Sequence, residues 1–255
     1  MDNMKPGTIR NGEKRGVWNA LFSRLLAIIA LDVLFIKAQF ELQWLFFGPI
    51  GEHATAILDI LKSHQSDIAV HLSAQKSLWS YLGTVPALHP HAWAIGGWAC
   101  LLLTAIYIAY CLLQGISWMI AGSHDVRYLR AFALMNIPIA MIYGLIEFTF
   151  RATNFLLTIQ QPGEPVYAAP WLYAALLLLL AYVATAAYRA PEEPLQTALS
   201  RGHALRFALV AAALACIHAI MLVPVLTKLA GYLLLLPAMA YGKMVLSSKP
   251  HPTEG

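Results

Sequence analysis

Apolar and polar positions in this chain are grouped in long blocks, with apolar runs of about 20 residues or more separated by shorter polar segments. A helix rises about 1.5 Å per residue, so about 20 apolar residues cross a hydrocarbon layer of about 30 Å. We therefore predict an all-α fold, a polytopic transmembrane helix bundle with six spans. The predicted spans are residues 17–47, 92–121, 131–151 and 168–188, and two helices within residues 207–246, split at 227–231.

The first span is longer than one crossing requires, and we expect Gly48 and Pro49 to end it. After it, charged residues such as Asp59 and Lys62 alternate with apolar ones at three- and four-residue spacing over residues 51–82. This spacing is typical of an amphipathic helix that lies on a membrane surface. We predict one such surface helix on the outer side, within an outer segment formed by residues 48–90.

Lysine and arginine are distributed unequally between the two sides of the six-span arrangement. Twelve of the 17 lie on the side of the N-terminus, which by the positive-inside rule places both termini in the cytoplasm. With five spans, Lys243 and Lys249 would move across and the distribution would be 10 against 7. We prefer six spans in a single integral membrane domain, residues 1–255. Its cytoplasmic parts are a basic tail (1–16), a charged loop (189–206) and a C-terminal tail (247–255).

The composition supports the membrane class, because 59% of the residues are hydrophobic and only 12% are charged. The net charge of +4 follows from Lys and Arg kept on one side of a membrane and does not indicate a nucleic-acid partner. Cys100, Cys111 and Cys216 all lie in apolar spans, so we interpret them as packing residues. Ala92, Gly96 and Cys100 are four residues apart, a small-residue strip that favours close helix packing.

Polar residues within the spans form two stripes. Asn136, Tyr143 and Glu147 share one line on the third span with Arg151 beside it. Asp32, Gln39 and Gln43 share one face of the first span, with Lys37 at a depth similar to that of Asp32. Charged groups in a membrane span are costly unless they face protein or water. We expect the two stripes to meet in the outer half of the bundle, as an ion-pair network that locks the first span to the third. The alternative is a proton- or ion-handling site. The predicted network comprises Asp32, Lys37, Asn136, Tyr143, Glu147 and Arg151.

Five of the nine histidines lie between His53 and His91. His64, Asp67 and His71 have the spacing of one helix face, and imidazole and carboxylate suit zinc or copper. With His89 and His91 they form a candidate transition-metal site on the outer side. The alternative is that histidine is simply tolerated at the membrane interface. We predict no other cofactor.

Motifs for catalysis or nucleotide binding are absent from the sequence, which contains no GxSxG, HExxH or Gly-rich phosphate loop. It also lacks the internal repeat that is typical of many transporters. We therefore expect a non-enzymatic structural, accessory or assembly subunit of a larger membrane complex, with the lipid bilayer and other membrane subunits as partners. The alternatives are a small transporter or channel that uses Asp32 and Glu147, and a metal-binding membrane protein or enzyme that uses the outer histidines.

Overall fold

The computed structural model describes residues 9–73, 83–160, 170–221 and 227–248. Side chains are described for all of these except residues 9–17, 71–73, 152, 155–160, 220–221 and 227–232. The described residues form helices joined by short turns, and none of them lies in a β-strand. The prediction of an all-α fold is therefore confirmed.

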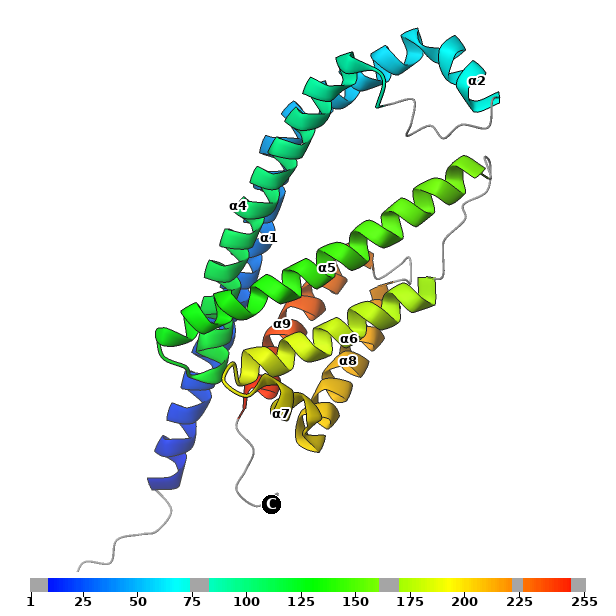
Figure 1. Cartoon of the computed structure of the whole chain (residues 1–255). Helices are drawn as coiled ribbons and strands as arrows, with labels where there is room; N and C mark the ends of the chain where they lie inside the picture. The colour runs from blue at the N-terminus through cyan, green and yellow to red at the C-terminus, as the bar shows by residue number, and fades with distance from the viewer. Residues whose placement is uncertain (1–8, 74–82, 161–169, 222–226, 249–255) are drawn as a thin grey trace, which may run out of the picture. The chain divides into compact units, whose positions relative to one another are not determined.

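The long helices coincide closely with the apolar runs of the sequence. Five helices are long and apolar enough to cross a membrane, and the described part of a further one has a shorter apolar stretch, Leu233–Ser247. The chain is thus a multi-pass membrane protein by length and composition. The helices are α1 (Ile9–Ser63), α2 (Gln65–Ser73), the 3-10 turn η1 (Pro86–Leu88), α4 (His89–Gly122), α5 (Arg127–Gln160), α6 (Pro170–Arg189), α7 (Pro194–Leu199), α8 (Arg201–Met221) and α9 (Thr227–Ser247) (Figure 1).

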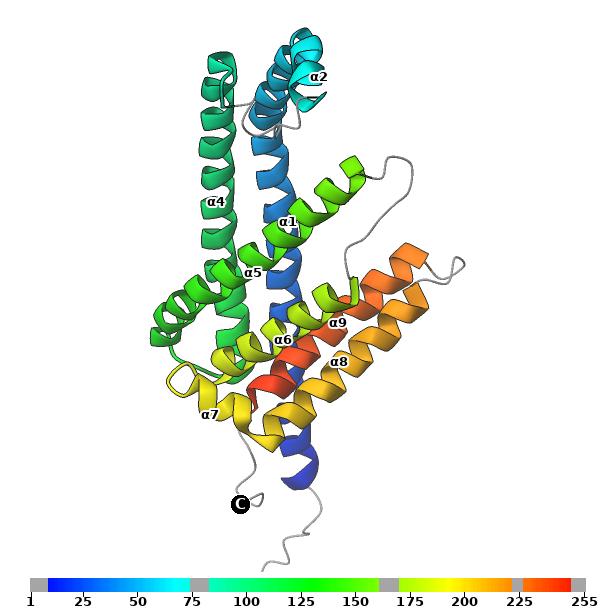
Figure 2. The same ribbon diagram turned by 45° about the vertical axis from the view of Figure 1, so that its right-hand side comes forward.

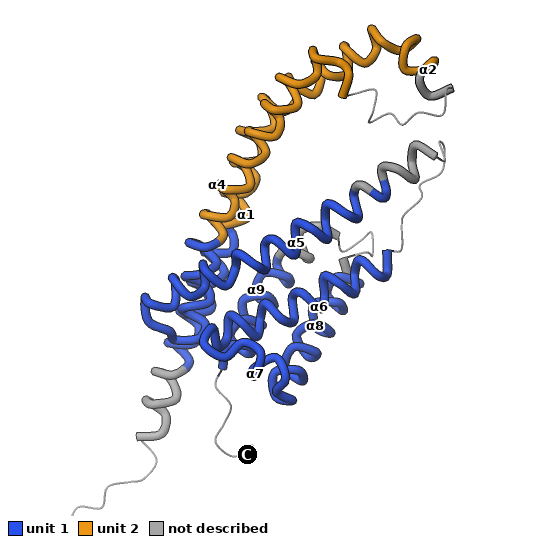
Figure 3. Tube along the Cα trace, in the orientation of Figure 1, with its two compact units in different colours: residues 1–33, 111–255 blue, residues 34–110 orange. Residues whose placement is uncertain are grey.

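Contacts divide the chain into two compact units, coloured separately in Figure 3. Unit 1 comprises residues 1–33 and 111–255, and unit 2 comprises residues 34–110. Helices α1 and α4 run from one unit into the other without a break in their helical structure. The single membrane domain therefore stays a prediction.

Unit 2 is built on the antiparallel pairing of α1 and α4, which lie side by side in both ribbon views (Figures 1 and 2). A step toward the C-terminus of α1 is matched by a step toward the N-terminus of α4. Three ring pairs show this register, with centroid distances of 5.5, 5.9 and 5.4 Å: Phe35–Tyr110, Phe46–Trp98 and His53–His91. Interlocking rings therefore hold the two helices in one register.

The predicted end of the first helix at Gly48 and Pro49 is wrong, because α1 continues through Pro49 to Ser63. A proline removes one backbone hydrogen bond and crowds the carbonyl four residues earlier, which can bend a helix without ending it. The predicted amphipathic helix over residues 51–82 is consequently divided between the last turns of α1 and the separate helix α2, and residues 74–82 lie outside the described residues.

Among the described residues, no helix packs closely against the small-residue strip of α4, where we predicted close helix packing. Ala92, Gly96 and Cys100 are exposed, and a Cβ added to Gly96 would meet no described atom within 4 Å. The strip therefore lies away from the α1 contact, which α4 makes through residues such as Trp98.

In unit 1, α8 and α9 form an antiparallel pair in which the helices approach closely (Figure 2). A Cβ added to Gly242 would lie 2.9 Å from Val210 Cγ1, so glycine permits this approach. Arg206 near the start of α8 donates to the Ser248 carbonyl beyond the end of α9 at 2.5 Å. The predicted hairpin position is wrong, since residues 227–231 belong to the start of α9; residues 222–226 lie outside the described residues.

A tight turn joins α4 to α5. Ser123 has a left-handed backbone (φ 54°), and the backbone N–H of His124 bonds to the Met119 carbonyl at 3.0 Å, as in a Schellman end. The Asp125 side chain then caps α5 by accepting from the Arg127 N–H at 3.1 Å. Arg24 of α1 donates to Ser123 Oγ at 2.8 Å, so the part of α1 around Arg24 lies beside this turn.

The polar turns of unit 1 gather at one end. The α4–α5 turn and the α6–α7 turn line one cavity of about 520 Å³, and Arg206 and Ser248 join the start of α8 to the end of α9. We call this the arginine end. Its arginines include Arg24, Arg127, Arg189 and Arg206. It contains the segments that the six-span arrangement places in the cytoplasm, and residues 189–206 there form α7 and the start of α8.

Candidate functional site

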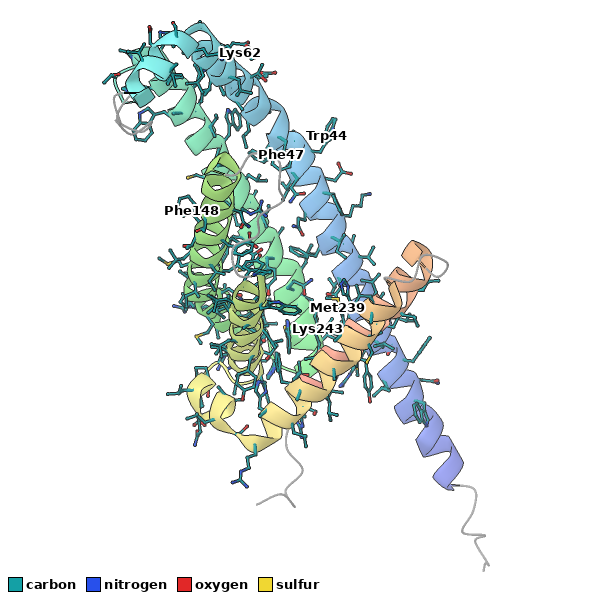
Figure 4. The ribbon with its side chains drawn as sticks, turned by 90° about the vertical axis from the view of Figure 1, so that its right-hand side faces the viewer. Trp44, Phe47, Lys62, Phe148, Met239 and Lys243 are labelled. Carbon is teal, nitrogen blue, oxygen red and sulfur yellow. The ribbon has the colours of Figure 1, made fainter. Side chains whose placement is uncertain are left out.

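A cluster of four polar side chains lies inside unit 1. Lys243 of α9, labelled in Figure 4, is the donor at its centre. It donates to Asp32 Oδ1 of α1 at 2.5 Å, to Gln114 Oε1 at 2.6 Å and to Ser117 Oγ at 2.9 Å, the last two on α4. Gln114 Nε2 in turn donates to Asp32 Oδ1 at 3.0 Å, and Ser117 Oγ does so at 3.4 Å. Asp32 is only 2% exposed, and the other three are also buried. We call these four residues the buried polar cluster.

The helices explain how the cluster forms. Gln114 and Ser117 are three residues apart and so share one face of α4, which presents both to α1 and α9. An ammonium group has three N–H donors, and Lys243 has three oxygen acceptors around it. The charge of Asp32 balances that of Lys243, so the cluster is neutral as an ion pair. It joins the N-terminal helix of the chain to the C-terminal one.

One oxygen of Asp32 is not used in these contacts. Oδ2 is buried and has no hydrogen-bond partner among the described residues, whereas Oδ1 accepts from three donors. A buried carboxylate oxygen without a partner is costly, so such exceptions are few in folded proteins.

The depth of the cluster follows from the register of α1. Asp32 is eight residues beyond Arg24, which is level with the α4–α5 turn, so it lies about 12 Å along the helix from the arginine end. Ser117 and Lys243 are likewise within a few residues of the helix ends found there. We expected Asp32 in the outer half of the bundle; it lies near the arginine end, which the six-span arrangement predicts to be cytoplasmic, so these two predictions do not agree.

Glu147 forms a second polar group on α5. It accepts from Tyr143 Oη at 3.2 Å, from Arg151 Nε at 2.8 Å and from the hydroxyl of Tyr173 on α6. The Glu147 side chain is 17% exposed, whereas that of Arg151 is 82% exposed. Because α5 extends to Gln160, Glu147 lies close to the middle of the helix.

Asn136 belongs to a third group. It is buried, donates to the Phe132 carbonyl at 2.8 Å and accepts from Tyr188 Oη of α6 at 2.5 Å. The polar stripe of α5 therefore meets α6 and not α1.

The predicted network is thus divided, and the predicted lock between the first and third spans is wrong. Asp32 pairs with Lys243, while Glu147 pairs with Arg151 on its own helix. Lys37 belongs to unit 2, is exposed, and makes no ion pair within the described chain. Helical spacing shows which residues share a face of one helix, but it does not show which helix that face meets.

Several residues of these groups were missed from the sequence. Gln114 and Ser117 carry a signal in their three-residue spacing within an apolar span. Lys243 was counted only as an indicator of orientation, although it lies four residues before the end of an apolar helix. Tyr173 and Tyr188 lie in the apolar α6, and each interacts with α5 through its hydroxyl.

The predicted metal ligands are not brought together. His64 follows the last residue of α1, and its Nδ1 lies 2.9 Å from the carbonyl of Ile60 in that helix, whereas Asp67 belongs to the separate helix α2. Among the described side chains, no three His, Cys, Asp or Glu residues form a group that could hold a metal ion. The side chain of His71 lies outside the description, and His89 is exposed at the start of α4. His91 instead faces His53, with 3.1 Å between their Nδ1 atoms.

Comparisons of the chain with models of protein families, with curated proteins and with solved structures found no match. Function has to be argued from the residues themselves. The buried polar cluster can hold three helices together through its ion pair and hydrogen bonds.

Proposed function

We propose that this protein is a structural or assembly subunit of a larger membrane complex, with six spans and both termini in the cytoplasm. One observation carries the proposal: Lys37 and Glu41 are exposed on α1 within an apolar stretch. Charged side chains at membrane depth almost always face protein or a water-filled cavity. An exposed pair there indicates a surface that another membrane subunit covers.

Both residues lie inside the apolar run of α1. Residues 33–47 contain only these two charged side chains, and the run belongs to a helix that is long and apolar enough to cross a membrane. A long lysine side chain can extend toward the nearer surface, but glutamate is shorter. Contact with lipid at the centre of a span costs about 2.5 to 3.5 kcal/mol per charged residue.

Large apolar residues surround the two charges on the same face. Leu34, Trp44 and Leu45 are exposed, and Trp44 is 81% exposed and points away from the helix pair (Figure 4). At about 100° per residue, these five side chains cover an arc of about 100° on α1. We call this surface the α1 strip. A tryptophan flanked by charges suits a protein interface, where aromatic anchors and paired charges provide much of the binding energy.

The test compares two double variants that remove the same kinds of charge from the same helix. Lys37→Gln/Glu41→Gln should remove the partner subunits from the protein purified in mild detergent while the folded protein survives. The matched control is Asp59→Asn/Lys62→Gln, which removes an exposed pair 3.4 Å apart and should keep the partners. Identical subunit composition in both variants, or wild-type protein that is monodisperse and alone, would contradict the proposal.

A second candidate function rests on the buried Asp32 Oδ2. This carboxylate lies inside the helix bundle beside the Lys243 ammonium, and an ionisable group at such a position is typical of a proton or ion pathway. This predicts proton or ion flux in proteoliposomes that Asp32→Asn abolishes in a variant that still folds. Wild-type protein without flux would exclude this function and leave the assembly role.

A further inference from the structure

We propose that His53 and His91 form a two-histidine site for a divalent transition-metal ion such as Zn²⁺ or Cu²⁺. The site lies within unit 2, where α1 supplies His53 and α4 supplies His91. The ligand set predicted from the sequence includes His91 but not His53, and the assembly role involves neither residue.

The geometry of the two rings suits a shared ion. Their Nδ1 atoms are 3.1 Å apart while the ring centroids are 5.4 Å apart at 52°, so the nitrogens point toward one another and the rings do not stack. With metal–nitrogen bonds of about 2.0 Å, two ligands are about 3.3 Å apart in a tetrahedral site and about 2.8 Å apart at a square corner. The observed 3.1 Å lies between these values, so binding requires only small movements.

The surroundings allow an ion to enter. Both imidazoles are half-buried and not enclosed, so water can reach them and complete the coordination. Because no group of three candidate ligands exists among the described side chains, the remaining positions would hold water or another exchangeable ligand. Such an open site binds more weakly than a closed four-ligand zinc site and exchanges its ion more readily.

The ion would have a structural effect as well. Residues 53 and 91 belong to the helix pair whose register is also fixed by Phe46 and Trp98. Without metal, one imidazole must donate a proton to the other, which fixes opposite tautomers on the two rings. An ion bound by both would replace this hydrogen bond by two coordinate bonds and clamp α1 to α4. The ion class follows from the ligands, since imidazole favours zinc, copper and nickel over magnesium or calcium.

The test uses the purified full-length protein, stripped of metal and titrated with Cu²⁺ and with Zn²⁺. Wild type should bind one ion per chain at this pair, and electron paramagnetic resonance of the Cu²⁺ form should show two imidazole nitrogens. His53→Gln and His91→Gln should each leave one nitrogen and weaken binding at least tenfold. Glutamine keeps a polar side chain, and thermal unfolding without metal verifies that each variant is folded.

Two other histidines of unit 2 serve as matched controls. His64→Gln, just after the end of α1, and His89→Gln, at the start of α4, should leave the affinity and the spectrum unchanged. The proposal is overturned if wild type does not bind copper or zinc near one ion per chain. It is also overturned if the His53→Gln/His91→Gln variant retains the wild-type affinity, because the ion would then be held by exposed histidines elsewhere and the pair would be joined by a proton only.

Discussion

Replacing Lys243 by methionine tests whether the buried polar cluster stabilises the fold. Methionine has a side chain of similar length but no ammonium group, so the substitution leaves the Asp32 carboxylate buried without its counter-ion. Gln114 and Ser117 each lose the ammonium as a hydrogen-bond donor. At 2.5 Å and an effective dielectric constant of about 20, the Coulomb attraction between the two charges is about 7 kcal/mol. Burial of the two charges offsets most of this attraction, so the pair as a whole contributes little net stability.

Removing one partner is different, because the desolvated charge that remains is no longer compensated. We expect Lys243→Met to lower the free energy of unfolding by about 3 to 5 kcal/mol. For a chain of this size that corresponds to a fall in Tm of about 6 to 20 °C. The assay is thermal unfolding of the purified protein in detergent, followed by loss of the monodisperse peak in size-exclusion chromatography.

The double variant Asp32→Leu/Lys243→Met separates charge from packing. It removes both charges while keeping a similar side-chain volume, so its free energy of unfolding should return to within about 2 kcal/mol of the wild-type value. The remaining loss arises because Gln114 and Ser117 no longer have these hydrogen-bond partners. The reasoning is refuted if Lys243→Met leaves Tm unchanged, or if the double variant is as unstable as the single one.

Three further substitutions test the α5 contacts and the α4–α5 turn, each by the same thermal assay. Glu147→Gln should cost less than about 1 kcal/mol, because the Gln carbonyl can still accept from Tyr143 and Tyr173 and the Arg151 side chain is 82% exposed; a loss of several kcal/mol would contradict this weak ion pair. Asn136→Ala should cost about 1 to 3 kcal/mol, since the buried hydroxyl of Tyr188 loses its acceptor, and an unchanged Tm would contradict that contact. Asp125→Ala removes the cap of α5 and should cost about 0.5 to 2 kcal/mol, whereas Asp125→Asn should cost less.

Much of the fold could be predicted from the sequence because apolar runs and helix ends are local properties. The second and fourth spans were placed within a few residues of α4 and α6, and the apolar region after residue 206 was correctly divided into two helices. The first helix was ended too early because Pro49 is tolerated inside it. Local rules state the cost of a proline but not whether the surrounding contacts offset it.

The candidate site was less accessible to prediction. Asp32 and Glu147 were both recognised as unusual, and both have polar partners, but the choice of partner depends on which helices are neighbours. Asp32 and Lys243 are 211 residues apart in the chain, and helical periodicity carries no information about such a contact. His53 and His91 illustrate the same limit, since spacing grouped His64 with His71 and only the register of α1 against α4 brings the actual pair together.

The central claim is that the α1 strip meets another protein within the membrane. The most direct test places a photo-crosslinking amino acid at Trp44, with Leu209 on α8, also exposed, as the control position. In native membranes, the account predicts a crosslink from position 44 to one protein of defined mass, which Lys37→Gln/Glu41→Gln abolishes, and no such product from position 209. Crosslinks from position 44 to lipid alone, or a protein product that survives removal of both charges, would contradict it.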